Sequence, residues 1–81
     1  MVEIKTELGE VIRNLRLEAG LSQQALADRC GLKRAYIGTI ERGGKAITVE
    51  TALKVALGLG VRLSSIFDRL ENIVRCEEER R

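Results

Sequence analysis

The stretch LSQQALADRCGLKRAYIGTIERG, residues 21–43, decides the fold of this 81-residue chain. Ser22 can cap a short helix, because its hydroxyl can accept a hydrogen bond from a backbone N–H of the first turn. Gly31 follows that helix at a position where a left-handed backbone is expected. A second short helix fits residues 33–42 and stops at the two glycines that follow. The stretch therefore predicts a helix-turn-helix, with cations on one face of the second helix.

One further helix is expected before this pair. Leu8, Val11, Ile12 and Leu15 recur at spacings of three and four, which indicates one apolar face of a helix. Thr6 is the expected cap of this helix. Gly20 is its expected end.

Two helices are expected after the pair. Thr48 should cap the first of them, and the GxG at Gly58 and Gly60 is interpreted as its termination. Its expected apolar face consists of Val49, Ala52, Leu53, Ala56 and Leu57. The last helix should begin near residues 63–65, and its charged tail, EEERR, should fray. The prediction is an all-α, compact five-helix bundle that forms a single domain over residues 1–81.

Composition and charge agree with this fold and indicate a partner. Proline is absent, and Leu, Ile, Ala, Glu and Arg are frequent, which favours helices. The net charge is only +2, but residues 22–45 carry five cations against two anions. Residues 1–21 and 64–81 each sum to −1. Positive charge thus gathers on the helix-turn-helix, as a phosphate-facing surface requires.

The sequence argues against catalysis. It contains no histidine to act as a base, no phosphate-binding loop and no dinucleotide fingerprint. Cys30 and Cys76 alone cannot complete a zinc site, so neither a metal nor another cofactor is expected. No apolar run approaches the roughly 20 residues of a membrane span, and the acidic N-terminus does not fit a signal peptide. We expect a cytoplasmic protein with two buried, reduced cysteines and no membrane partner.

The second helix of the pair carries side chains suited to reading base edges. The fork of N–H donors on Arg34 can bond both acceptors of a guanine, and Ala35 can touch a thymine methyl. Thr39 can do either. Gly38 costs roughly 1 kcal/mol in a helix interior relative to alanine. Close approach to DNA or a crowded contact with another helix would each explain it.

Residues 21–43 resemble the helix-turn-helix of phage repressors and Cro proteins, the XRE family of lambda-repressor-like domains. The matching residues are Gln23, Ala27, Gly31, Ile37, Ile40, Glu41 and Gly43. Leu15 and Arg16 before them, and the helix over residues 49–61 after them, extend the resemblance over most of the chain. The run RAYIGTIERG, residues 34–43, is most similar to controller proteins of restriction–modification systems. Lys33 and Arg62 depart from the pattern, which usually has capping residues there.

The resemblance implies roles for individual residues. Base readers would be Arg34, Ala35 and Thr39, with Tyr36 at the edge of the groove. Phosphate contacts would come from Gln23, Lys33, Arg42 and Lys45. Arg16 and Glu41 match an arginine and a glutamate that form a structural ion pair in the family. The alternatives are a solvated surface charge for each cation and, for Tyr36, a place at the edge of the core.

The last helix suggests a second copy of the chain. Its apolar residues, spaced three and four apart, are Leu63, Ile66, Phe67, Leu70, Ile73 and Val74. We expect Leu63 and Phe67 to pack on the protein's own core. Leu70, Ile73 and Val74 would lie beyond it, at a twofold interface that makes this a dimerisation helix.

The expected function is sequence-specific transcriptional regulation by a homodimer on double-stranded DNA. The dimer would bind a palindromic operator with half-sites roughly 10 base pairs apart. A restriction–modification controller is the leading interpretation, and RNA polymerase is a further candidate partner. The alternatives are a phage or plasmid repressor and an antitoxin-like module that binds another protein.

Overall fold

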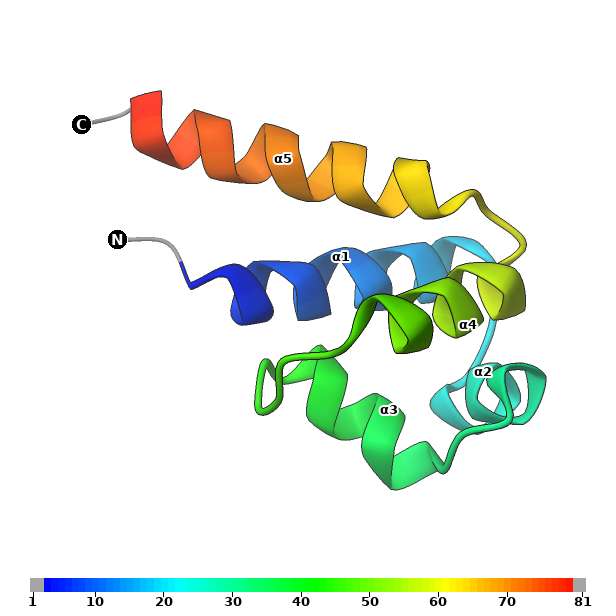
Figure 1. Cartoon of the computed structure of the whole chain (residues 1–81). Coiled ribbons are helices and arrows are strands. Elements are labelled where there is room, and N and C mark those ends of the chain that lie inside the picture. The colour runs from blue at the N-terminus through cyan, green and yellow to red at the C-terminus, as the bar shows by residue number, and fades with distance from the viewer. Residues whose placement is uncertain (1–2, 80–81) are drawn as a thin grey trace.

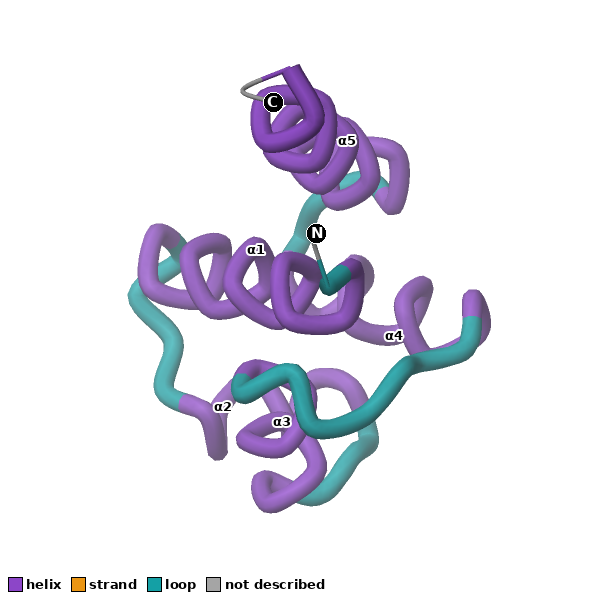
Figure 2. Tube along the Cα trace, turned by 90° about the vertical axis from the view of Figure 1, so that its left-hand side faces the viewer, coloured by secondary structure: helices purple, strands orange, loops and turns teal. Residues whose placement is uncertain are grey.

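The computed structural model describes residues 3–79, which form five helices and no strand. The helices are α1 (Ile4–Glu18), α2 (Gln23–Cys30), α3 (Arg34–Glu41), α4 (Val49–Leu59) and α5 (Leu63–Glu79). Figures 1 and 2 show α5 on one side of the molecule and the α2–α3 pair on the other, with α1 and α4 between them. The predicted all-α, five-helix fold is confirmed.

The helix ends around the central pair follow the sequence signals. The Ser22 hydroxyl accepts from the Ala25 backbone N–H at 3.0 Å, and Gly31 ends α2 with a φ of 70°. The Thr48 hydroxyl accepts from the Thr51 backbone N–H at 3.1 Å at the start of α4. Lys33 occupies the N-cap of α3 without a side-chain hydrogen bond. The two-helix unit therefore forms where the capping residues predict it.

The prediction that Thr6 caps α1 was wrong. The helix begins at Ile4, with Glu3 in the N-cap position and no side-chain cap. Thr6 lies inside the first turn and packs against Gly43, where an added Cβ would come within 2.7 Å of the Thr6 Cα. A helix with tertiary contacts does not need a capping side chain at its start. The contact with Gly43, and not a capping hydrogen bond, therefore accounts for the place of Thr6.

The core lies where the five helices meet. Ile37 and Ile40 of α3 are buried, as their spacing predicts, and Ile66 of α5 is buried as well. Burial of a side chain of this size contributes about 1.5–3 kcal/mol relative to exposure. The buried residues of the apolar cluster are Val11, Ile12, Leu15, Leu26, Ala27, Cys30, Ile37, Ile40, Val55, Ala56, Leu59 and Ile66.

The predicted apolar face of α4 was wrong for three of its five residues. The helix buries Ala52, Val55, Ala56, Gly58 and Leu59. The expected core residues Val49, Leu53 and Leu57 are instead 69%, 46% and 71% exposed. Because α4 is apolar on most sides, the spacing of its residues does not fix which side turns inward.

Gly58 brings α4 close to α2, and the interpretation of the GxG motif as the end of this helix is confirmed. It lies in the last turn of the helix, against α2, where an added Cβ would come 2.5 Å from the Cys30 Sγ. Gly60 is the C-cap of the helix, with a φ of 74°. The missing side chain at Gly58 lets α4 approach α2 more closely than any other residue would allow.

Two expectations for α5 change. Leu63 packs on the core, but Phe67 is 38% exposed. Ile73, expected beyond the core, is half-buried against it. Residues 77–79 of the tail that was expected to fray are helical in the structure, and residues 80 and 81 lie outside the described range. Within residues 3–79, no helix is both long and apolar enough to cross a membrane.

Gly9 sets the position of α3 on the scaffold. An added Cβ would lie 2.8 Å from the carbonyl oxygen of Glu41 and closer still to that of Ile40. Both atoms belong to the backbone at the end of α3, so α1 crosses α3 there with no room for a methyl group. Nothing in the sequence around Gly9 distinguishes it from an ordinary helical glycine.

We expect Gly9→Ala to destabilise the fold by about 3 kcal/mol or more, the upper end of the range for overpacking, because backbone atoms cannot rotate away. Urea unfolding monitored by circular dichroism measures the change. Glu10→Ala, at the exposed neighbouring position, is the matched control and should unfold like the parent. A Gly9→Ala protein as stable as the parent would show that α1 and α3 can separate without cost.

Candidate nucleic-acid interface

The outer face of α3 is built on a buried inner face. Ile37 and Ile40 anchor the helix in the core, which turns Arg34 and Ala35 to the solvent. Thr39 is half-exposed on the same side. Its hydroxyl donates to the Ala35 carbonyl oxygen at 3.0 Å and accepts from Arg42 Nη2 at 3.4 Å. Thr39 would therefore have to give up a bond within the helix to donate to a base edge.

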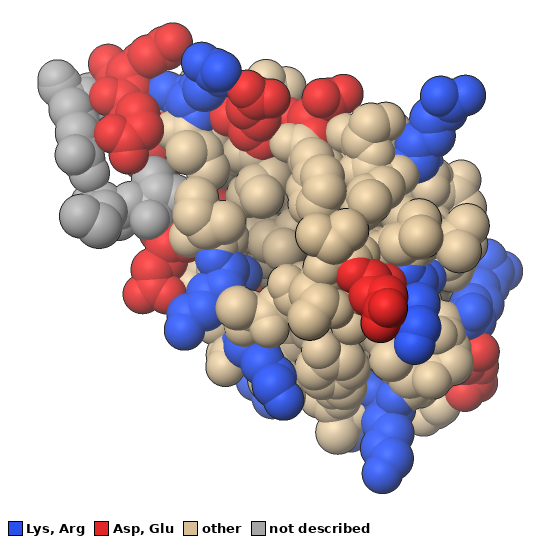
Figure 3. Space-filling view, in the orientation of Figure 1, with Lys and Arg blue, Asp and Glu red and all other residues tan. Residues whose placement is uncertain are grey.

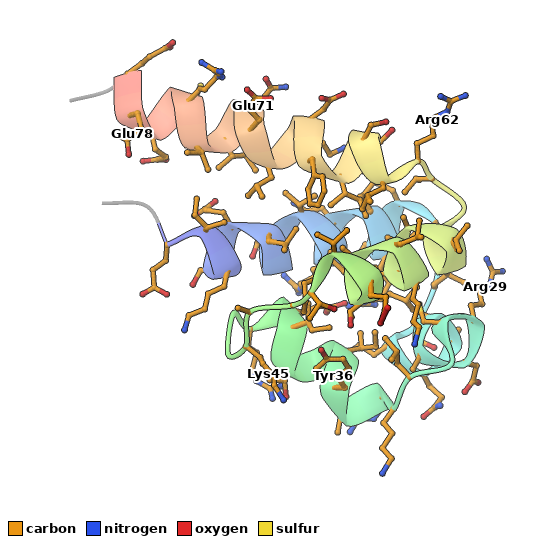
Figure 4. All side chains as sticks on the ribbon, viewed as in Figure 1. Arg29, Tyr36, Lys45, Arg62, Glu71 and Glu78 are labelled. Carbon is orange, nitrogen blue, oxygen red and sulfur yellow. The ribbon has the colours of Figure 1, made fainter. Side chains whose placement is uncertain are left out.

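Tyr36 lies at the edge of the core, one of the two places that the sequence left open for it. Its ring is half-buried against the core. The Lys45 ammonium lies over the same ring, 5.5 Å from its centroid, a cation–π geometry. Figure 4 shows both side chains on the part of the molecule formed by α3 and the loop that follows it. The ring thus holds the Lys45 side chain at the edge of the α3 surface.

Gly38 lies beneath two polar side chains. An added Cβ would come 3.2 Å from Arg42 Nη1 and 3.7 Å from Gln23 Oε1. No backbone of a neighbouring helix is among these nearest atoms, and the contact with another helix that the sequence offered as an explanation is made here by the Gln23 side chain of α2. The glycine gives the Arg42 and Gln23 side chains room to lie flat on α3.

Arg16 and Glu41 form the buried ion pair that the family resemblance implies. Arg16 Nε lies 2.6 Å from Glu41 Oε2, and Arg16 Nη2 lies 3.0 Å from Oε1. Their side chains are only 9% and 3% exposed. Arg16 Nη1 also donates to the Leu21 carbonyl oxygen at 2.9 Å, and the hydrogen bond to Glu41 raises the pKa of Arg16. The pair joins α1, the turn before α2 and the end of α3.

Gln23 has contacts that sequence reasoning missed. Its Nε2 donates to Glu41 Oε1 at 3.1 Å, and its Oε1 accepts from Arg34 Nη1 at 3.1 Å. The sequence assigned Gln23 to a phosphate contact, but its side chain lies between a buried carboxylate and an exposed arginine. The family pattern marks the position, and only the fold shows what the amide touches.

The cations separate from most of the anions on the surface. Lys33, Arg34, Arg42 and Lys45 are all exposed and lie on α3 or beside its ends. Figure 3 shows acidic side chains gathered at the far end of α5, while basic side chains dominate the lower part of the molecule, over α3. The α3 side is therefore the positive side, suited to a polyanion.

The two cysteines differ in environment. Cys30 is buried and Cys76 is exposed, so the expectation of two buried thiols was wrong for Cys76. Burial raises the pKa of the Cys30 thiol, which favours its protonated, unreactive form. Among residues 3–79, no group of three potential ligands could hold a metal ion.

Comparison with known proteins agrees with this geometry. A helix-turn-helix family model matches residues 12–66. The control protein C.BamHI of Bacillus amyloliquefaciens is 33% identical over 78 residues, 95% of each chain. The wild-type restriction–modification controller protein C.Esp1396I is 30% identical, with a TM-score of 0.84 over 91% of this chain and 97% of that one. The controller protein C.AhdI of Aeromonas hydrophila is 36% identical, with a TM-score of 0.73 over 75% and 92%.

The exposed, cation-lined α3 and the likeness to these proteins together identify a DNA-binding transcriptional regulator. More narrowly, the chain belongs to the helix-turn-helix family, and these controller proteins are among its relatives.

We expect Glu41→Ala to cost about 3–5 kcal/mol in unfolding free energy, because it leaves Arg16 buried and unpaired. Replacing both partners, with Arg16→Met and Glu41→Leu, should recover much of that loss. Denaturant unfolding of the two proteins measures this. Glu18→Ala is the control, since its pair with Arg69 is exposed and screened by solvent. A Glu41→Ala protein that unfolds like the parent would contradict a structural role.

Proposed function

We propose that this chain is a restriction–modification controller that binds a palindromic operator as a homodimer. The observation that supports this most is the outer face of α3, where an exposed Arg34 and Ala35 stand on a helix anchored from behind. The helix has the dimensions that a DNA major groove admits. The likeness to controller proteins along nearly the whole chain supports a role in a restriction–modification system. A phage or plasmid repressor and an antitoxin-like module remain the alternatives.

Base readout would centre on the start of α3. The Arg34 guanidinium can donate to the N7 and O6 acceptors of a guanine, and the Ala35 methyl can touch the methyl group of a thymine. Thr39 follows on the same face, and Tyr36 stands at its edge. These four residues read the operator in our proposal.

Phosphate contacts would flank the readout surface. Lys33 precedes α3, and Arg42 and Lys45 follow it, so the two ends of the helix carry cations. Gln23 begins α2, where its backbone N–H has no partner within the helix and can face a phosphate. RNA polymerase is a further candidate partner, as the enzyme that an operator-bound regulator would act on. Operator binding would bring the protein to the bacterial nucleoid. The proposal includes no catalysis and no cofactor.

Arg34→Ala and Lys33→Ala test this assignment as adjacent variants. Arg34→Ala should cost about 1–3 kcal/mol on the operator and relax the preference at one base position. Lys33→Ala should weaken binding to all duplexes alike and lower the salt slope by about one unit. Gel shifts on operator and random DNA over a series of salt concentrations measure both. Equal losses of Arg34→Ala on the two duplexes would reduce Arg34 to a phosphate contact.

The dimer interface must leave both recognition helices facing one duplex. Figures 1 and 2 show α5 and α3 on opposite sides of the molecule. Pairing through the outermost side of α5 would therefore turn the two α3 helices away from each other. A twofold axis that passes along one flank of the molecule would keep both α3 helices on the same side of the dimer. We therefore place the interface on the flank where α4 and α5 are both accessible. Figure 3 shows mostly uncharged residues across the middle of this flank.

We propose that apolar residues of α5 and α4 form this interface. Leu70 and Val74, with Ile4 and Phe67, line a shallow groove along α5. Ile73 contributes less, because it already packs on the core. Leu53 and Leu57 of α4 form the more exposed part and extend the interface beyond the helix that the sequence indicated.

Leu57→Asp and Val74→Asp should each make the protein monomeric at micromolar concentration without loss of helical signal. Operator affinity should fall further than in Lys33→Ala, because two linked half-sites act together. Sedimentation equilibrium measures the association. The control is Leu17→Asp, since Leu17 of α1 is 52% exposed and lies outside the proposed interface. A parent that is monomeric well above micromolar concentration, yet binds a palindrome tightly, would contradict the dimer.

A further inference from the structure

Arg42 continues the outer face of α3 beyond the last residue of the helix. Its backbone keeps right-handed helical angles, with φ at −83° and ψ at −2°. Its N–H donates to the Gly38 carbonyl oxygen at 3.1 Å, as a residue inside the helix would. The regular spacing of side chains on α3 therefore includes Arg42.

This spacing places Arg42 in line with residues proposed to read DNA. It follows Thr39 by three positions, Gly38 by four and Ala35 by seven. Residues separated by these intervals lie on one face of a helix. The buried isoleucines of α3 occupy the opposite face. Arg42 thus belongs to the face that would enter the major groove.

The Arg42 side chain lies back along this face. Because the Cα–Cβ bond of a helical residue tilts toward the N-terminus, a long side chain covers the turn that precedes it. Arg42 Nη2 donates to Thr39 Oγ1 at 3.4 Å, and Nη1 lies 3.2 Å from where a Cβ on Gly38 would be. A larger residue at position 38 would take up part of this space. The glycine leaves room for the guanidinium on the groove-facing surface.

The cation that follows Arg42 in the chain is held elsewhere. The Lys45 ammonium lies over the Tyr36 ring, 5.5 Å from its centroid, at the edge of the α3 surface. Figure 4 shows the two labelled side chains there. The edge of a helix in the groove faces the phosphates, whereas its outermost face meets the base edges. The two cations after α3 are therefore placed for different contacts.

The hydrogen bonds of Thr39 leave this part of the face without a donor of its own. The Thr39 hydroxyl proton is used by the Ala35 carbonyl oxygen at 3.0 Å, so the hydroxyl can only accept from a base. A guanine presents two acceptors, N7 and O6, in the major groove. Arg42 has five N–H groups and uses one of them on Thr39. Its guanidinium can supply both donors that a guanine requires.

We propose that Arg42 is a specificity-determining residue, whose guanidinium donates to a guanine at a base pair other than the one that Arg34 reads. The inference rests on the proposed operator binding, and it adds a base contact to the phosphate contact proposed for Arg42. The guanidinium already lies on the groove-facing surface, so little rearrangement is needed when a base meets it. The proposed readout surface then reaches from the start of α3 to the residue after its end.

Arg42→Lys tests the inference, because lysine keeps the positive charge for a phosphate but lacks the planar fork that bonds two acceptors at once. The probes are a duplex selected by the parent from a library with randomised half-sites and a scrambled duplex of equal length. The variant should lower the preference for the selected duplex about tenfold, equivalent to about 1.4 kcal/mol. The loss should fall at a base pair that Arg34→Ala leaves unchanged. Binding to the scrambled duplex should stay within about twofold of the parent.

Two variants serve as controls. Arg29→Lys makes the same substitution at an exposed arginine of α2, which Figure 4 shows pointing away from α3, and it should leave the preference unchanged. Lys45→Ala should weaken binding to both duplexes alike and lower the salt slope by about one unit, whereas Arg42→Lys should keep the slope of the parent. Thermal unfolding should give the same melting temperature for Arg42→Lys and the parent, because Arg42 is exposed.

Three results would overturn the inference. An unchanged preference in Arg42→Lys would leave Arg42 with a phosphate contact alone. A loss confined to the base pair that Arg34→Ala relaxes would show that Arg42 reads no base of its own. A lower melting temperature with equal losses on both duplexes would make Arg42 a structural residue. If instead the parent selects no duplex, or Arg34→Ala keeps the parent's preference, the proposed function itself fails.

Discussion

The buried ion pair between Arg16 and Glu41 is the interaction on which the arrangement of α1, α2 and α3 depends. It connects α1, the turn at Leu21 and the end of α3. The desolvation of two charges offsets much of their attraction, so such a pair need not add much to the free energy of folding. Its geometric demand is strict, because two nitrogens of the guanidinium must meet the two carboxylate oxygens while the third meets the Leu21 carbonyl oxygen. Together with the close crossing at Gly9, the pair allows α3 one position.

The two faces of α3 are held by different kinds of contact. Its inner face is held by Ile37 and Ile40, where burial in a close-packed core resists any change of volume. Its outer face is organised by polar contacts among Thr39, Arg42 and the backbone. These contacts are solvent-accessible and exchange readily with those of a ligand. The helix is therefore fixed in position, while the side chains on its outer face can change their hydrogen-bond partners when a ligand binds.

Local signals predicted most of the fold, while contacts distant in sequence decided what was missed. Ser22, Thr48 and Gly31 act on their own neighbours along the chain, so the sequence could place the helix ends. Gly58 lies against Cys30 of another helix, and nothing near it in sequence shows this. The rotation of α4 was missed for the same reason. The family pattern located the candidate site, but the contacts of Gln23 depend on three helices meeting.

Ala35 has an exposed methyl group beside an arginine whose position depends on the interior. Its side chain can be exchanged without disturbing the core, because only its backbone carbonyl takes part in a hydrogen bond that holds the helix face. A change at Arg34 would also leave the Gln23 amide without its acceptor role. Under the proposed readout, related chains would acquire new target sequences more readily through position 35 than through position 34. Within such a family, target preference would change most readily at surface residues whose side chains make no contact with the interior.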